Sequence, residues 1–210
     1  HDIIGVVSKD LSMPILSHVL IEKSEKQINI TGTNLEMQIT VKAAFLESDE
    51  FDPITVSGRK LYEIVRSLDD QNVQIRTTKT RLILKTNSSA FKFSTLSANN
   101  YYTFDETIPL ETFTIKQEQL LDLLNKTSFS MATNPGVRKI LCGLQLEIEP
   151  NKLTAIATNG HRLAISSTHH EKKQINKLIC VMPKKVVLEL TRILQGDKKA
   201  KVSVGSNQIR

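Results

Sequence analysis

The chain has 210 residues, of which 40% are hydrophobic and 24% are charged, and its formal net charge is +6. This composition supports a folded core and excludes a wholly disordered chain, and no apolar run reaches the ~18 residues that a membrane-spanning helix needs. The charge is unevenly distributed along the chain: residues 1–111 carry 12 basic and 15 acidic side chains, whereas residues 112–210 carry 16 basic and 7 acidic ones. The excess of positive charge in the second half favours a polyanionic partner, and charge that serves only solubility is the alternative.

Two periodicities alternate along the chain and predict its elements. From the N-terminus, apolar–polar alternation predicts a strand at 28–31, and apolar residues at 3.6 spacing predict a helix over 58–68. The helix has a predicted apolar face made of Leu61, Ile64, Val65 and Leu68. A strand at 81–85, a helix over 117–129 and a strand at 144–148 follow. A helix over 183–194 and a strand at 201–204 complete an α+β pattern.

The sequence repeats itself at an interval of about 125 residues. Ile15-Leu16 and Ile140-Leu141 stand 125 positions apart (140 minus 15), and Thr33-Asn34 and Thr158-Asn159 keep the same interval (158 minus 33). A unit of this length can bury its own core, unlike a solenoid repeat. The repeat predicts two domains of one fold, with a boundary near residues 110–111.

The predicted helices over 58–68 and 183–194 carry basic residues at matching positions. These residues are Arg59, Lys60 and Arg66 in the first copy and Lys184, Lys185 and Arg192 in the second. Lysine and arginine beside phosphates contribute binding through counterion release, independently of base sequence. The repeated face favours contact with a nucleic-acid backbone, and a solvated helix face is the alternative. The chain lacks Trp and is poor in aromatics, which disfavours a base-stacking platform.

No catalytic or metal-binding motif stands out. GxSxG, GxxxxGK[ST], HExxH and GxGxxG are all missing from the sequence, so we expect no catalytic residues, no metal and no cofactor. We interpret the His169–His170 pair as part of a solvated loop. Asn159-Gly160 predicts a tight turn, and the adjacent His161 and Arg162 fit the rim of a small binding groove better than a general base.

The cysteine content and the first residues bear on the compartment. Two cysteines without CxxC spacing fit reduced thiols better than a disulfide framework. The first residues show no secretory signal. We therefore expect a cytoplasmic protein.

Several short segments together resemble one protein family. The segment Thr158-Asn159-Gly160-His161-Arg162-Leu163-Ala164 closely resembles the T-[DN]-G-H-R-L-A signature of bacterial DNA polymerase III beta subunits, the sliding clamps. Further similar segments lie at 14–16, 31–37, 58–61, 93–96, 129–132 and 204–210. The resemblance covers essentially the whole chain.

The resemblance implies a fold and a function that spacing could not show. It implies tandem α+β domains with antiparallel sheets outside and helices on the inner face of a ring. Two subunits close head-to-tail as a homodimer around double-stranded DNA, which is bound without regard to sequence. The ring is a processivity factor that tethers the DNA polymerase III catalytic subunit and other replication and repair polymerases, and a clamp loader opens it. It has no catalytic activity and no membrane contact.

The resemblance also assigns site residues. It implies a groove for short partner peptides formed by Leu141, Thr158, Gly160, His161, Arg162 and Leu163. It implies DNA-facing positions at Arg59, Lys60, Arg66, Arg138, Lys139, Lys184, Lys185 and Arg192. At the Lys139–Ile140 positions the family pattern often has aromatics, so the character of the contact differs here.

Relative to the family pattern, we expect this chain to be a truncated form. Domain one is expected over residues 1–111 without most of its N-terminal helix. Domain two is expected over 112–210 without its last strands, and the third domain is absent. A basic module that binds nucleic acid by open contact, without encircling it, is the alternative function.

Overall fold

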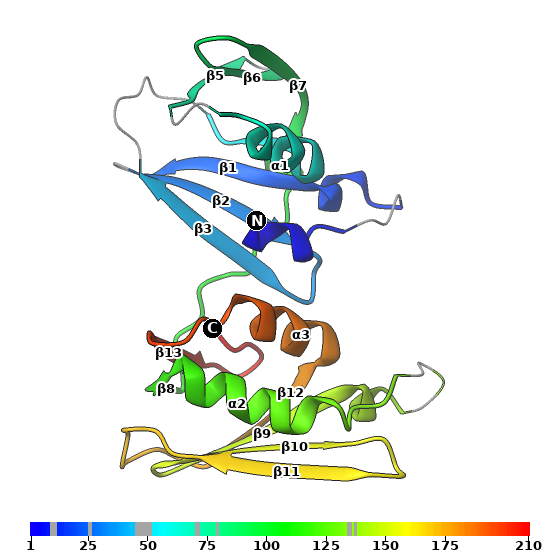
Figure 1. Cartoon of the computed structure of the whole chain (residues 1–210), viewed down its shortest axis with the longest axis vertical. Helices are drawn as coiled ribbons and strands as arrows, with labels where there is room; N and C mark the ends of the chain where they lie inside the picture. The colour runs from blue at the N-terminus through cyan, green and yellow to red at the C-terminus, as the bar shows by residue number, and fades with distance from the viewer. Residues whose placement is uncertain are drawn as a thin grey trace. The chain divides into compact units, whose positions relative to one another are not determined.

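The computed structural model describes residues 1–8, 12–24, 27–44, 52–69, 72–78, 80–133, 136 and 138–210 (Figure 1). It divides into two units, His1–Asp105 and Glu106–Arg210, each with its own hydrophobic core. The boundary predicted between residues 111 and 112 falls within strand β8 (Glu111–Lys116) of the second unit.

The first unit is built on one antiparallel sheet of seven strands. Its strands follow the order β3-β2-β1-β4-β7-β6-β5, and every neighbouring pair is antiparallel. The strands are β1 (His18–Ser24), β2 (Gln27–Thr33), β3 (Gln38–Ala44), β4 (Ile54–Ser57), β5 (Gln74–Thr78), β6 (Arg81–Lys85) and β7 (Ala90–Ser97). Short 3₁₀ turns at Asp2–Gly5, Pro14–Ser17 and Ala98–Asn100 accompany them.

Helix α1 (Gly58–Arg66) packs its apolar stripe against this first core. Leu61, Ile64 and Leu68 contact the buried residues as predicted. Val65 does not, because it remains 47% exposed. The packed stripe is centred on the line through Leu61, Ile64 and Leu68, so Val65 lies at its border, and its predicted place in the core is wrong.

The second unit contains a four-stranded antiparallel sheet in the order β11-β10-β9-β12 and a two-stranded sheet of β13 with β8. Helices α2 and α3 lie side by side over one face of the larger sheet (Figure 1). The remaining elements are α2 (Gln117–Ser128), a 3₁₀ turn at Lys139–Cys142, β9 (Gly143–Glu149), β10 (Lys152–Thr158), β11 (Leu163–Thr168), β12 (Leu178–Pro183), α3 (Lys184–Ile193) and β13 (Lys199–Val204).

The order of elements repeats between the units as the 125-residue interval predicts. The sheet segment β3-β2-β1-β4 has the same order as β11-β10-β9-β12, and α1 follows β4 as α3 follows β12. Alternation accounts for the burial in β9, where Leu144, Leu146 and Ile148 are buried and the intervening residues are not. The two tandem copies of one α+β fold are thereby confirmed.

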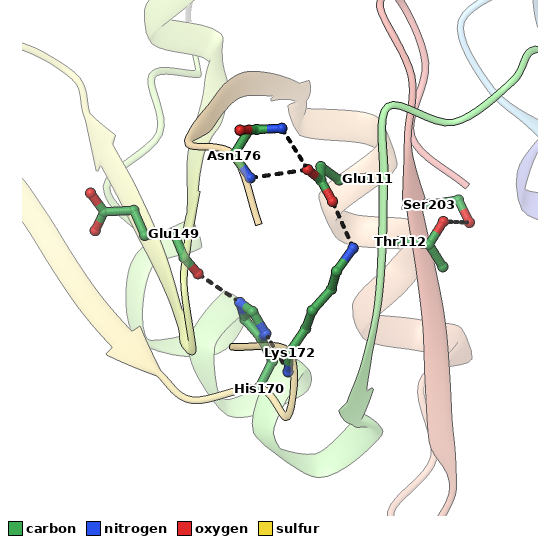
Figure 2. Close-up of polar contacts among 7 residues, drawn as sticks. All are labelled: Glu111, Thr112, Glu149, His170, Lys172, Asn176 and Ser203. Atoms are coloured by element: carbon green, nitrogen blue, oxygen red, sulfur yellow. Dashed lines mark hydrogen bonds and ion pairs between the residues drawn. The ribbon is translucent and has the colours of Figure 1, made fainter. Parts of the chain in front are cut away.

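The connection between β11 and β12 is held to β8 by polar contacts of the Glu111 carboxylate (Figure 2). The Glu111 carboxylate accepts hydrogen bonds from the Asn176 backbone N–H (3.0 Å), the Asn176 side-chain amide (3.0 Å) and the Lys172 ammonium (2.6 Å). The Asn176 backbone N–H and Lys172 together hold the pKa of Glu111 below its ordinary value. The long connection is therefore held in place without regular structure of its own.

His170 is buried, which corrects the expectation of a solvated loop. Its ring is 3% exposed and packs on Phe113 with centroids 4.6 Å apart. Nε2 lies 2.9 Å from the Glu149 carbonyl oxygen, and the Lys172 backbone N–H donates to Nδ1 at 3.3 Å (Figure 2). Both ring nitrogens have a hydrogen-bond partner, so the side chain is satisfied inside the fold. His169 remains exposed as expected.

Candidate functional site

Both α1 and α3 carry two adjacent basic residues in the first turn and have no side-chain cap. Ser57 and Pro183 precede the helices, neither makes a capping hydrogen bond, and neither first turn contains an acidic side chain. Cations at a helix N-terminus are disfavoured by the helix dipole, and the free N–H groups there attract anions. The arrangement therefore favours an anionic ligand at the start of each helix.

The basic residues at these helix starts are open to solvent. Arg59, Lys60 and Lys185 are exposed, and Lys184 is half-buried. The predicted apolar face of the helix over 58–68 implies that Arg59 and Lys60 lie off that face, and both are exposed.

The basic residues at the helix ends differ from each other. Arg66 lies exposed in the last turn of α1, where a cation is favoured by the dipole. Arg192 lies in the last turn of α3, and its Nε and Nη2 atoms donate to Glu189 Oε2 at 2.9 and 2.8 Å. Arg192 is thus partly neutralised, so its contact with a phosphate would have to compete with Glu189.

Arg138 and Lys139 lie outside the helices. Both are exposed and stand at the start of the 3₁₀ turn at Lys139–Cys142, where the Leu141 N–H bonds the Arg138 carbonyl at 2.9 Å. This bond joins the backbone of Arg138 to that of Leu141. Of the eight predicted DNA-facing residues, these two lie closest in sequence to Leu141, one of the predicted groove residues.

The second site is the turn between β10 and β11. The Asn159 side-chain oxygen accepts from the backbone N–H groups of His161 and Arg162, both at 3.0 Å. The Thr158 hydroxyl donates to the Arg162 carbonyl at 2.8 Å, and Gly160 has φ +89°, a left-handed conformation that glycine adopts without strain. The turn is therefore held rigid by its own side chains.

The rigid turn holds polar and apolar groups out into solvent. His161 and Arg162 are exposed, and Leu163 is 62% exposed. Leu163 pairs with Thr158 in the last strand pair before the turn. A protruding leucine flanked by two polar side chains on a fixed backbone can bind the apolar side chain of a partner.

The segment after α2 connects this turn to Leu141. The Arg162 guanidinium donates to the Phe129 carbonyl and lies 5.5 Å from the centroid of the Phe129 ring. Three residues further on, the Ala132 N–H donates to the Leu141 carbonyl at 2.8 Å. The predicted groove residues, which are separated by 17 positions in sequence (158 minus 141), are thus joined through Phe129–Ala132.

Sequence reasoning missed two apolar residues of this surface. Phe129 is 57% exposed and Ile140 is 63% exposed, whereas Leu141 is half-buried. The helical pattern over 117–129 places Phe129 at the end of an amphipathic helix, and the 125-residue repeat pairs Ile140 with Ile15. Exposure of a large apolar residue leaves no trace in periodicity, so no sequence signal distinguished them from core residues.

Among the residues that the structure describes, no helix is both long and apolar enough to cross a bilayer. Cys142 and Cys180, both among the described residues, are not in a disulfide, and burial raises the pKa of Cys180 to about 11. A thiol of this kind is a poor nucleophile near neutral pH.

Comparison with known proteins gives consistent matches along the chain. Residues 1–105 match the family model described as DNA polymerase III beta subunit, N-terminal domain, and residues 114–210 match that of the central domain. The beta sliding clamp of Pseudomonas putida is 37% identical over 209 residues, which are 98% of this chain and 56% of that protein. The beta sliding clamp of Escherichia coli is 33% identical over 201 residues, or 95% of this chain and 54% of that protein.

Solved structures show the same similarity. A crystal structure of the DNA polymerase III subunit beta from Pseudomonas aeruginosa superposes with a TM-score of 0.94 at 34% identity, covering 100% of this chain and 57% of that one. A sliding clamp from the same organism bound to griselimycin superposes with a TM-score of 0.92 at 34% identity, with the same coverage. The chain therefore spans a little over half the length of the relatives that it matches.

Proposed function

Because the chain belongs to the DNA polymerase III beta subunit family, we propose that the whole protein is a sliding clamp, a ring that encircles duplex DNA and acts as a processivity factor for DNA polymerase. It holds DNA by topology and by sequence-independent contacts to phosphates. It tethers the DNA polymerase III catalytic subunit and other replication and repair polymerases, and a clamp loader opens it. It carries out no chemical step of its own and acts in the cytoplasm.

The repeated basic helix start supports the proposed contact with DNA. Two uncapped helix N-termini in separate units each carry adjacent cations. This arrangement costs helix stability and is compensated when phosphates lie nearby. Arg59, Lys60, Lys184 and Lys185 are the principal contacts in this proposal, Arg66 adds to them, and Arg192 contributes less because it shares Glu189.

The turn between β10 and β11 supports the proposed peptide groove. Leu163 and Leu141 would contact the apolar anchors of a partner peptide, with Thr158, Gly160, His161 and Arg162 as the polar rim. Phe129 and Ile140 enlarge the apolar area, since both are exposed beside these residues. Arg138 and Lys139 lie beside this groove, so they remain DNA-facing candidates that also border the peptide.

In the proposed clamp, this chain forms two of the three domains of one subunit. The relatives are longer, and we propose that a third domain in the whole protein supplies the other wall of the groove and one side of the contact in a homodimeric ring. The two units here then contribute four of the six domains of the ring.

A topological test distinguishes the clamp from the alternative. Whole-length protein is loaded onto nicked circular DNA with its clamp loader, separated from free protein, and the circle is then cut once. We expect retention on the circle and loss after the cut, with retention restored when the DNA ends are blocked. Equal loss from circular and linear DNA, governed only by salt, would show a basic module that binds by open contact and would reject the clamp.

A further inference from the structure

The two-stranded sheet of β8 and β13 has one face turned away from the core. Phe113, Ile115 and Val204 on the other face are 3%, 2% and 3% exposed. Strand alternation then places every second residue on the outward side, and the register pairs them across the sheet. We call this side the lysine face, and it consists of Thr112, Thr114 and Lys116 on β8 with Lys199, Lys201 and Ser203 on β13.

The lysine face concentrates positive charge at one end. Lys116 lies directly opposite Lys199, and Lys201 lies two residues further along the same strand, at a spacing of about 7 Å. All three are exposed. Like charges directly opposite each other destabilise an antiparallel pair, so the sheet by itself gains nothing from this arrangement.

Hydroxyl groups occupy the remaining positions of the lysine face. Thr114 lies opposite Lys201, and Thr112 lies opposite Ser203 with 3.1 Å between their hydroxyl oxygens (Figure 2). Beyond Ser203, the backbone of Arg210 exchanges hydrogen bonds with Ser203, and its guanidinium lies 3.3 Å from Glu106. Ammonium and hydroxyl groups are both donors to phosphate oxygens.

The carboxylate of Glu171 already lies close to these lysines. Glu171 Oε1 is 2.7 Å from Lys199 Nζ, and Lys199, with a smaller effect of Lys116, holds the pKa of Glu171 below its ordinary value. The two side chains of the ion pair are 69% and 56% exposed, for Glu171 and Lys199 respectively. An exposed pair of this kind contributes little stability and exchanges readily with an external anion.

The chemistry of the lysine face favours nucleic acid over a protein partner. Protein interfaces depend on apolar or aromatic anchors in desolvated pockets, and none of the six residues of this face is apolar. Phosphate binding needs only cations that release counterions. The face also has no aromatic ring on which the bases of a single strand could stack, so duplex DNA fits it best.

We propose that the lysine face is a second DNA-contact surface of this chain, which binds the phosphate backbone of a duplex without reading its bases and which is separate from the basic start of α3. Binding replaces Glu171 by phosphates beside Lys199 and Lys116. Binding at the lysine face uses part of the excess positive charge of residues 112–210, in addition to the basic residues at the start of α3.

The test measures binding of the 210-residue chain to a fluorescein-labelled linear duplex by anisotropy across a series of salt concentrations. The variant Lys116→Gln/Lys199→Gln/Lys201→Gln should lower the slope of log affinity against log salt by about 2 to 3, near 0.9 for each lost phosphate contact. The matched control Lys126→Gln/Lys152→Gln/Lys177→Gln removes the same charge from other surfaces and should change the slope by less than about 1.

A second variant, at an exposed side chain, should change the affinity for DNA in the opposite direction. Glu171→Gln removes the competing carboxylate, so affinity for the duplex should rise about two- to fivefold at low salt. Equal slopes for the lysine-face and control variants, or no gain from Glu171→Gln, would overturn the proposal.

Two further arms identify the ligand. Tighter binding of a labelled poly-glutamate peptide or of a single strand, lost in the lysine-face variant, would replace duplex DNA by that ligand and reject the proposal. A slope that falls only in Lys184→Gln/Lys185→Gln would reject the lysine face and leave the clamp assignment standing.

Discussion

Replacing both lysines at the start of α3 should make the protein more stable and weaken its binding to DNA. The variant Lys184→Gln/Lys185→Gln removes two cations from a first turn that has no acidic side chain and no side-chain cap. Each removed cation relieves about 0.3–1 kcal/mol of unfavourable interaction with the helix dipole, so the free energy of unfolding should rise by about 0.6–2 kcal/mol. The slope of log DNA affinity against log salt should fall by about 1.8, since two phosphate contacts are lost.

Urea unfolding followed by circular dichroism measures the first quantity, and anisotropy with a linear duplex measures the second. The stabilisation should shrink at high salt, because the dipole interaction is screened. The control Lys152→Gln/Lys173→Gln removes two exposed cations outside the helices and should leave stability unchanged. A lower free energy of unfolding together with an unchanged salt slope would refute the reasoning, because the lysines would then stabilise the fold rather than bind phosphate.

Three other predictions concern peptide binding, core packing and the pH dependence of stability. Leu163→Ala should weaken binding of a partner peptide to the whole protein by about 1–3 kcal/mol in calorimetry, while Ile179→Ala, which is 57% exposed on β12, should leave it unchanged; equal effects would reject the groove. Leu124→Ala, at a fully buried site on α2, should lower the free energy of unfolding by about 2–5 kcal/mol, whereas Leu188→Ala at a 51% exposed site should cost far less. Burial raises the pKa of Tyr101 to about 12, so stability should be fully present below pH 10 and decline as the pH rises from 10 towards 12; a Tyr101→Phe variant that declines equally would exclude this phenol as the cause.

The local sequence pattern was sufficient to predict most of the secondary structure and the duplication of the fold. The three helices and the four strands predicted from periodicity all occur, with ends that differ by a few residues. The 125-residue interval anticipated the shared order of β3-β2-β1-β4 and β11-β10-β9-β12. These features follow from side chains close together in sequence, which set the choice between helix and strand and the buried face of each element.

The candidate site was only partly predictable. The residues of the turn between β10 and β11 were recognisable because turn chemistry is local, with Asn159 and Gly160 as its markers. Phe129 and Ile140 were not, since their exposure depends on which distant surfaces leave them uncovered. The neutralisation of Arg192 by Glu189 was within reach of sequence reasoning, because residues three apart face each other on a helix.

By itself, the sequence determined the α+β class, the tandem repeat, the basic helix starts and the resemblance to sliding clamps. Only the tertiary structure decided that His170 is buried against Phe113 and that Lys116 lies opposite Lys199. The partners in these contacts are separated by 57 residues (170 minus 113) and 83 residues (199 minus 116). Periodicity reports which face of an element is apolar, but which elements pair, and in which register, is set by packing of the whole core. For that reason the lysine face has no signature in the sequence, since its charges come together only when β8 and β13 pair.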